Sequence, residues 1–354
     1  MPGSRARPLP ERDLDHILEQ THGLWEDLRG GRLFVTGGTG FFGRWMLESF
    51  LRANDELSLG AQVLVLTRDP RGFADAAPHV AGHVAIMLQS GDVKTFEFPI
   101  LECTHVLHMA TETDLGVSPA ASFQTAIEGT ERVLAFAARS GVRKLLLTSS
   151  GAVYGPQPPD CQRLSEEFNG APRPEDASAG YGHGKRAAEF LCSVAASETE
   201  LQAKIARCFA FVGPALPLNA NFAIGNFIRD ALYGDRIEVT GDGTPRRSYL
   251  YAADLAVWLW TILFRGESGR PYNVGSEADL SISELAHLVA RVVRPGIPVN
   301  IAQAAASGAL PARYVPSTTR AARELDVHSR VDLDDAVLRT ADWYSAGPMP
   351  RGHR

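Results

Sequence analysis

The strongest constraint on the fold is a regular alternation along the chain, in which short apolar segments are followed by longer segments with helical periodicity. The short segments predict β-strands at residues 32–36, 62–67, 105–109, 144–149 and 204–209. The longer segments predict helices at residues 41–53, 120–140 and 181–197. Strands that alternate with helices build βαβ units and a parallel sheet that is buried on both faces. We therefore predict an α/β fold with a doubly wound parallel sheet.

The alternation stops after residue 210, where Pro- and Asn-rich segments predict a second, smaller lobe. We expect a sheet domain of residues 31–210, to which 246–275 return, and a C-terminal substrate-binding lobe of 211–245 and 276–342. An N-terminal extension, 1–30, carries Leu14, Ile17 and Leu18 at helical spacing and is expected to pack on the core or on another subunit. We expect residues 1–10 and the tail 343–354 to be loose.

Composition excludes several classes of function. The formal net charge of -6 gives no support for a nucleic-acid surface. The longest apolar run, 255–264, is far shorter than the roughly 20 residues that span a bilayer, and the N-terminus lacks a signal-peptide pattern. The four cysteines lie far apart without metal-ligand spacing. We expect a soluble, cytoplasmic protein without a membrane segment, nucleic-acid partner or metal, and we expect a homodimer.

A glycine-rich turn joins the first strand to its helix. Gly37, Gly40 and Gly43 have GxxGxxG spacing, and Phe41 and Phe42 complete the turn. Glycines allow a tight turn and close backbone approach, and the helix N-terminus offers amides to a pyrophosphate. The alternative is a packing turn without a ligand. In this strand–turn–helix context, we predict a Rossmann-type domain that binds NAD(P).

The end of the second strand indicates which cofactor is preferred. An NAD site usually has an acid there that binds the ribose 2′-hydroxyl. This chain has Thr67 and Arg68, and the arginine is suited to a 2′-phosphate. Arg44 beside the turn is a candidate assistant, whereas Asp69 leaves an NAD site open. We favour NADP over NAD.

Further cofactor contacts are expected at the ends of the neighbouring strands. Asp92, followed by Val93, is placed to meet the adenine amino group, and Ala110 is placed to lie under the cofactor. These assignments depend on the register of the predicted sheet.

A tyrosine and a lysine four residues apart begin the helix at residue 181. Tyr181 and Lys185 therefore share one face of the helix, downstream of Ser149 and Ser150 at a strand end. Reduction of a carbonyl by hydride requires a proton donor, and a nearby ammonium lowers the pKa of a phenol toward a useful value. The combination predicts Ser/Tyr/Lys chemistry beside a nicotinamide.

With these motifs together, the chain resembles the extended short-chain dehydrogenase/reductase family of nucleotide-sugar epimerases, dehydratases, decarboxylases and reductases. The matching segments are Gly37-Gly-Thr-Gly-Phe-Phe-Gly43, Ser149-Ser-Gly-Ala-Val-Tyr-Gly155, Tyr181-Gly-His-Gly-Lys185, Gly241-Asp-Gly-Thr-Pro-Arg-Arg-Ser-Tyr249 and Ala252-Ala-Asp254. The resemblance spans about residues 32–325 and implies a nucleotide-diphosphate sugar as substrate.

The resemblance also implies roles for individual residues. Ser150 would bind the reacting oxygen, with Ser149 as the fallback; Tyr181 would be the acid/base, and Lys185 would tune Tyr181 and hold the nicotinamide ribose. The substrate diphosphate would be met by Arg247 and Arg313. Asn226 would either contact the nucleotide base or cap its helix, and His183 either faces solvent or touches substrate.

Departures from the family pattern limit the reaction. Sugar-nucleotide dehydratases carry an Asp-Glu pair, and the related decarboxylases a glutamate, where this chain has Gly151 and Ala152. Dehydration and decarboxylation are therefore disfavoured. Ala126 and Ala210 stand where the family typically has asparagines, which points to an unusual or deoxygenated sugar.

Two enzyme functions stay open. In the first, NADPH reduces a 4-keto sugar nucleotide, and Arg68 favours this interpretation. In the second, an epimerase with tightly held NAD acts through a transient 4-keto sugar. A non-catalytic dinucleotide sensor would predict a broken triad, whereas Ser150, Tyr181 and Lys185 are all present.

Overall fold

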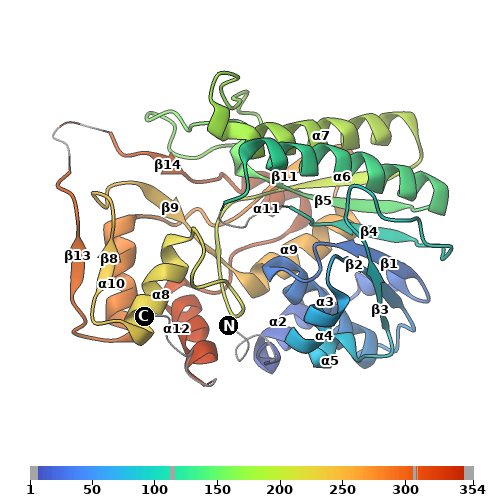
Figure 1. Cartoon of the computed structure of the whole chain (residues 1–354), viewed down its shortest axis with the longest axis horizontal. Coiled ribbons are helices and arrows are strands. Elements are labelled where there is room, and N and C mark those ends of the chain that lie inside the picture. The colour runs from blue at the N-terminus through green and yellow to red at the C-terminus, as the bar shows by residue number, and fades with distance from the viewer. Residues whose placement is uncertain (1–6, 112–115, 306–307, 309, 347–354) are drawn as a thin grey trace.

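The predicted parallel sheet is present in the computed structural model, which describes residues 7–111, 116–305, 308 and 310–346. The sheet has seven strands in the order β11-β6-β5-β4-β1-β2-β3, and each neighbouring pair is parallel (Figure 1). Its strands are β1 Arg32–Thr36, β2 Gln62–Thr67, β3 Ile86–Ser90, β4 His105–His108, β5 Lys144–Ser150, β6 Gln202–Cys208 and β11 Pro271–Val274. The predicted α/β, doubly wound fold class is confirmed, and β3 and β11 are the strands that the sequence did not delimit.

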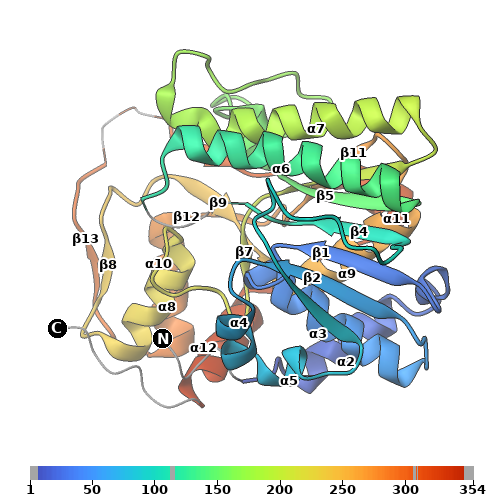
Figure 2. The same ribbon diagram turned by 45° about the vertical axis from the view of Figure 1, so that its right-hand side comes forward.

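Alternate residues of each strand enter different cores because successive side chains point to opposite faces. Leu33 and Val35 of β1 belong to one apolar cluster, whereas Phe34 belongs to the other. Helices α6 and α7 cover the second face, and α3 and α9 cover the first (Figures 1 and 2). Their bounds are α3 Phe41–Glu56, α6 Pro119–Ser140, α7 Gly180–Glu198 and α9 Ala252–Arg265. Burial on both faces explains why these strands are almost continuously apolar.

The strand order reverses between β1 and β4, and this places the site. In open α/β sheets, ligands bind outside the carboxyl ends of the strands at such a switch point. Thr36 pairs with His108 at the ends of β1 and β4, and Ser150 pairs with Cys208 at the ends of β5 and β6. The glycine turn and the serine are therefore presented along the same edge of the sheet.

A second group of elements lies beside that edge (Figure 2). Strands β12, β9 and β14 form a small mixed sheet, and β13 pairs with β8. The bounds are α8 Ala223–Tyr233, β8 Ile237–Val239, β9 Arg246–Ser248, β12 Asp279–Ser281, α10 Ile282–Val293, β13 Val299–Ile301, β14 Arg313–Tyr314 and α12 Leu333–Ser345. The remaining short elements are α4 Pro70–Ala76, α5 Pro78–Ala81, η2 Gly151–Tyr154, η3 Ala177–Ala179, β7 Phe211–Val212, β10 Leu250–Tyr251 and α11 Thr319–Leu325.

The N-terminal extension is firmly packed over its described part. The single helix expected there is divided into α2 Glu11–Gln20 and the short η1 Trp25–Leu28, with Gly23 at φ 85° between them. Leu9 is 2% exposed, and the Arg7 guanidinium donates to the Trp343 carbonyl at 2.8 Å. The expectation of a loose segment is therefore wrong for residues 7–10, while residues 1–6 lie outside the described part.

Polar contacts explain why this segment is ordered. Asp13 is fully buried and accepts from the hydroxyl of Tyr251 and from the guanidinium of Arg339, each at 2.6 Å. His16 contacts the buried Asp254 at 3.1 Å. The extension thus joins α9 to α12, and α12 belongs to the second group of elements.

No helix in the described ranges is both long and apolar enough to cross a membrane.

Asp13→Ala tests the energetic weight of this junction. Removing the carboxylate leaves the buried Tyr251 hydroxyl without its acceptor, while Arg339 keeps its second partner Asp335, so the free energy of unfolding should fall by about 1–3 kcal/mol. Asp15→Ala is the matched control, because Asp15 pairs with Arg52 at an exposed position and should cost less than about 1 kcal/mol. Chemical denaturation measures both. Equal losses of unfolding free energy in the two variants would show that the buried contacts of Asp13 do not stabilise the junction.

Candidate active site

The glycine turn is closed by backbone contacts that leave no room for side chains. Gly37 has φ 72°, and a Cβ built on it would lie 2.6 Å from the nitrogen of Ala110. A Cβ on Gly43 would lie 2.3 Å from the carbonyl oxygen of Gly38. Gly40 caps α3 and is exposed, with Phe41 and Phe42 as the first helical residues. The open first turn of α3 is therefore directed at the carboxyl edge of the sheet, where its amides can meet an anion.

The end of β2 carries the three residues considered for ribose recognition. Thr67 is buried, and its hydroxyl accepts from the amide of Asp69 at 3.2 Å. The Asp69 carboxylate caps α4 by accepting from the Gly72 amide at 2.9 Å. Arg68 is exposed between them. Asp69 therefore has a structural task, while Arg68 lies at the surface of the same strand end.

Arg44 is held away from the residues considered for ribose recognition. It is buried, forms an ion pair with Glu48 within α3, and donates to the Arg7 carbonyl. The prediction that Arg44 assists Arg68 at the ribose is therefore wrong, because Arg44 is held by Glu48 and by the Arg7 carbonyl.

The neighbouring strand ends supply the other predicted cofactor residues. Asp92 follows β3 and accepts from the Lys94 amide at 2.9 Å, and Val93 packs beside Gly129 of α6. Ala110 follows β4, and its amide donates to Thr36 at 3.2 Å. These residues line the same edge as the glycine turn.

Tyr181 and Lys185 lie in the first turns of α7. The ammonium of Lys185 donates to the Thr148 carbonyl at 2.9 Å and lies 5.9 Å from the Tyr181 ring centroid. Burial lowers the pKa of Lys185 to about 8. Burial also raises the pKa of Tyr181, against hydrogen bonds from Ser150 and Thr111. The pKa of Tyr181 is therefore shifted in the direction opposite to the lowering expected from Lys185, because burial outweighs the hydrogen bonds.

Ser150 ends β5 and faces a second phenol. Its hydroxyl accepts from the Ala152 amide at 3.2 Å and lies 3.4 Å from the hydroxyl of Tyr314. Burial raises the pKa of Tyr314 above its usual range. Tyr314 stacks on Phe209 with ring centroids 4.7 Å apart. Sequence reasoning missed both aromatic residues; the position of Tyr314 next to Arg313 was the only available signal.

The two aromatic residues close the space above Gly151. A Cβ on Gly151 would lie 2.7 Å from both the Phe209 ring and the Tyr314 hydroxyl. An acidic side chain at residue 151 would therefore clash in this arrangement. The packing around residue 151 therefore requires a glycine, and this glycine also leaves the position without an acid.

Ser149 points to the other side of β5. Its hydroxyl donates to the Glu189 carboxylate at 2.5 Å, and Glu189 is paired with Arg207 at 2.7 Å. The structure thus brings Ser150, and not Ser149, to Tyr181.

The two arginines expected on the substrate diphosphate are separated by the small sheet. Arg247 of β9 pairs with Tyr314 of β14, and its guanidinium lies 5.7 Å from that ring centroid. Arg313 lies opposite Arg246 in the pairing of β14 with β9, and its guanidinium forms an ion pair with Asp279 at 2.7 Å. Because side chains alternate along strands, Arg247 shares the face of Tyr314 and Ser150, whereas Arg313 lies on the opposite face.

The remaining two residues have local partners. The side-chain oxygen of Asn226 accepts from the Arg229 guanidinium at 3.1 Å. The N-cap of α8 is Phe222 and not Asn226. The His183 imidazole lies 3.2 Å from the Arg173 carbonyl. A cavity of about 560 Å³ is lined by Tyr181 together with Ala152, Gly155 and Arg173.

A comparison with protein families matches residues 33–275 to the model of the NAD dependent epimerase/dehydratase family. The chain belongs to this family. The match covers both the glycine turn and the Tyr181–Lys185 segment, and it confirms the resemblance found from the sequence motifs. Among the described residues, no three His, Cys, Asp or Glu side chains gather as a metal site would require.

Curated relatives cover most of the chain at modest identity. A UDP-glucuronic acid decarboxylase 1 from Xenopus tropicalis is 28% identical over 88% of this chain and 72% of its own length. A UDP-glucuronic acid decarboxylase 6 from Arabidopsis thaliana is 27% identical over 86% of each chain.

Solved structures share the fold at lower identity. A UDP-glucuronic acid 4-epimerase from Bacillus cereus, in complex with NAD, has a TM-score of 0.74 and 19% identity, covering 88% of this chain and 96% of its own. A dTDP-glucose 4,6-dehydratase from Streptomyces venezuelae, with NAD bound, has a TM-score of 0.73 and 24% identity, covering 89% and 97%. Epimerases, dehydratases and decarboxylases therefore all occur among similar proteins, and the reaction has to be argued from the site.

Gly43→Ala tests the glycine turn. The added Cβ would displace α3 from the turn, so the affinity for NAD and NADP should fall by more than about tenfold. Gly241→Ala is the control, because a Cβ there meets nothing within 4 Å. Titration calorimetry measures both cofactors. Wild-type affinity in Gly43→Ala would show that the cofactor binds elsewhere.

Proposed function

We propose that the protein reduces a 4-keto sugar, bound as a nucleotide diphosphate, with NADPH. The observation that carries this proposal is the meeting of Ser150 and Tyr181 at a strand end where no acidic side chain follows the serine. A dehydratase or decarboxylase needs an additional acid or base at that point. Ser/Tyr/Lys chemistry alone is sufficient for transfer between a carbonyl and an alcohol.

The residues at the edge of the sheet fit a dinucleotide. The close contacts at Gly37 and Gly43 leave only backbone at the turn, as a pyrophosphate requires. Gly37, Gly40, Phe41, Phe42 and Gly43 would hold the pyrophosphate. The far side of the edge would hold the adenosine through Thr67, Arg68, Asp92, Val93 and Ala110. When bound, the nicotinamide supplies the hydride.

The protein residues supply the proton and the orientation. The hydroxyl of Tyr181 donates its proton to the sugar oxygen, and Ser150 holds that oxygen by a hydrogen bond. Burial raises the pKa of Tyr181, so the phenol carries its proton at neutral pH. Lys185, fixed by the Thr148 carbonyl, holds the ribose and brings a positive charge close to the phenol.

Substrate recognition is assigned to the face of the small sheet that carries Arg247. Its guanidinium is suited to the diphosphate, because charge-assisted hydrogen bonds to phosphate are strong. Arg313 supports this arrangement indirectly, through the ion pair with Asp279 that it shares with Arg246. Asn226 is retained as a candidate contact to the nucleotide base.

The alternative function is nucleotide-sugar epimerisation with NAD. The observation that favours it is the presence of 4-epimerases among the similar structures, including one solved with NAD. The same three residues would remove a proton from the C4 hydroxyl and return it after the sugar has turned. Arg68 favours the reductase, since a cationic side chain at the ribose suits NADPH.

Tyr181→Phe tests the proton donor. Removing the hydroxyl should lower the rate at which NADPH is consumed with a dTDP- or UDP-4-keto sugar by about 10²-fold or more. The affinity for NADPH should not change. Tyr233→Phe is the control, because Tyr233 is a half-exposed phenol on α8. A near-wild-type rate in Tyr181→Phe would remove this residue from the mechanism.

Arg68→Ala tests cofactor choice. Loss of a charge-assisted contact to the 2′-phosphate should weaken NADPH binding by about tenfold and leave NADH binding unchanged. Arg71→Ala, at an exposed position on α4, is the matched control. Nicotinamide fluorescence measures both affinities. Equal losses for NADPH and NADH would contradict the preference, and tight co-purifying NAD would favour the epimerase.

Two further expectations belong to this proposal. A homodimer and a cytoplasmic location stay predictions, to be measured by light scattering and by cell fractionation.

A further inference from the structure

A chain of buried polar contacts leads away from the catalytic helix. Glu189 lies one turn after Lys185 on α7 and accepts from Ser149 at 2.5 Å. Its carboxylate is paired with Arg207 of β6, which in turn donates to the hydroxyl of Tyr154 at 2.9 Å. The helix that presents Tyr181 is therefore connected to the end of η2.

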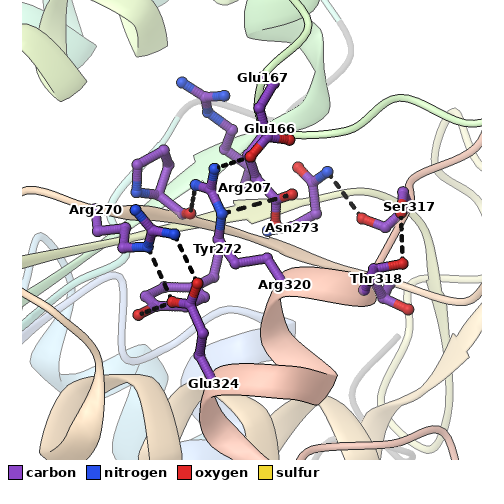
Figure 3. Close-up of polar contacts among 12 residues, drawn as sticks. Glu166, Glu167, Arg207, Arg270, Tyr272, Asn273, Ser317, Thr318, Arg320 and Glu324 are labelled. Atoms are coloured by element: carbon purple, nitrogen blue, oxygen red, sulfur yellow. Dashed lines mark hydrogen bonds and ion pairs between the residues drawn. The ribbon is translucent and has the colours of Figure 1, made fainter.

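The series of hydrogen bonds continues through the fully buried side chain of Asn273. The hydroxyl of Tyr154 donates to the side-chain oxygen Oδ1 of Asn273 at 2.8 Å. The Asn273 side-chain amide donates to the Leu164 carbonyl at 2.8 Å and to the Ser317 carbonyl at 3.0 Å, and Figure 3 shows the contact with Ser317. Burial raises the pKa of Tyr154 to about 12, so its hydroxyl stays protonated and donates to Asn273 while it accepts from Arg207.

Asn273 lies between two segments, the two walls, which meet where the Tyr314 hydroxyl lies beside Ser150. One wall is η2, Gly151–Tyr154, which begins directly after Ser150. The other is the segment 314–317, whose first residue, Tyr314, lies 3.4 Å from Ser150. The second wall is also paired with Leu164, because the Leu164 amide donates to Val315 at 2.8 Å and the Ser317 amide donates to Leu164 at 2.7 Å.

A separate cluster of polar side chains lies at the start of β11, the strand that carries Asn273. Arg270 pairs with Glu324 at 2.6 Å, and the Tyr272 hydroxyl contacts Glu324 at 3.1 Å (Figure 3). These contacts fasten α11 to β11 without touching either wall. Tyr272 is as buried as Tyr154, at 1% exposed, and so provides a matched phenol with a purely structural environment.

We propose that Tyr154 and Asn273 are positioning residues that join the Ser150 wall to the Tyr314 wall, and thereby keep the Ser150 hydroxyl where the sugar oxygen would bind. The assignment of a sugar to this place rests on the proposed function. The joining of the two walls does not, because it follows from the contacts alone. Neither residue needs to touch the substrate or the cofactor for this role.

Hydrogen exchange of the ligand-free protein tests whether the walls are joined. Tyr154→Phe removes one hydroxyl and should speed amide exchange about tenfold in both residues 150–155 and 314–317. Tyr272→Phe should speed exchange only at Glu267, whose amide donates to the Tyr272 hydroxyl, and near residues 320–325. Faster exchange in one wall alone, no change in either wall, or the same change in Tyr272→Phe would overturn the proposal.

Ligand affinity tests whether the joining matters for the pocket. The probes are UDP-glucuronic acid and dTDP-glucose, measured by calorimetry, with NADPH measured separately. Tyr154→Phe should raise the Kd of the sugar nucleotide about tenfold while the Kd of NADPH stays unchanged, and Tyr272→Phe should alter neither. An unchanged sugar-nucleotide Kd in Tyr154→Phe would overturn the positioning role. If the wild-type protein binds neither probe, the proposed substrate class fails, while the exchange experiment still decides whether the walls are joined.

Discussion

The contact between the glycine turn and its surroundings is the constraint on which the rest of the structure depends. Gly43 approaches Gly38 so closely that α3 can begin only where it does, and Gly37 fits against the backbone after β4 in the same way. These contacts fix the first turn of α3 at the switch point of the sheet. Every other part of the site is then defined relative to this turn: the end of β5 with Ser150, the start of α7 with Tyr181, and the small sheet that faces them.

Much of this arrangement could be predicted because the responsible signals are local. Periodicity delimited the first strands and their helices, and glycine spacing located the turn. The small sheet could not be predicted in the same way, since its strands are two or three residues long and carry no periodicity. For that reason Arg247 and Arg313 were expected to act together, although strand alternation separates them. The only signal for Tyr314 was its position next to Arg313, and its contact with Ser150 depends on the pairing of β14 with β9.

The pKa values of Tyr181 and Lys185 could not be predicted from the sequence either. A lysine four residues after a tyrosine suggests that the phenol pKa is lowered, but burial dominates and raises it. The ammonium of Lys185 is held by the Thr148 carbonyl, and its own pKa is lowered by burial to about 8. Helical spacing establishes that two side chains share a face, whereas the pKa depends on solvent exclusion and on partners from other elements.

The packing of the N-terminal extension has a consequence for how the chain is made. Arg7 is bound to Trp343, a residue 336 positions later, and Asp13 is bound to Arg339. Segments synthesised first therefore complete their contacts only after the last helix has left the ribosome. Until then, Leu9 and Asp13 lack part of their burial. The extension can therefore join α9 to α12 only as a final step of folding.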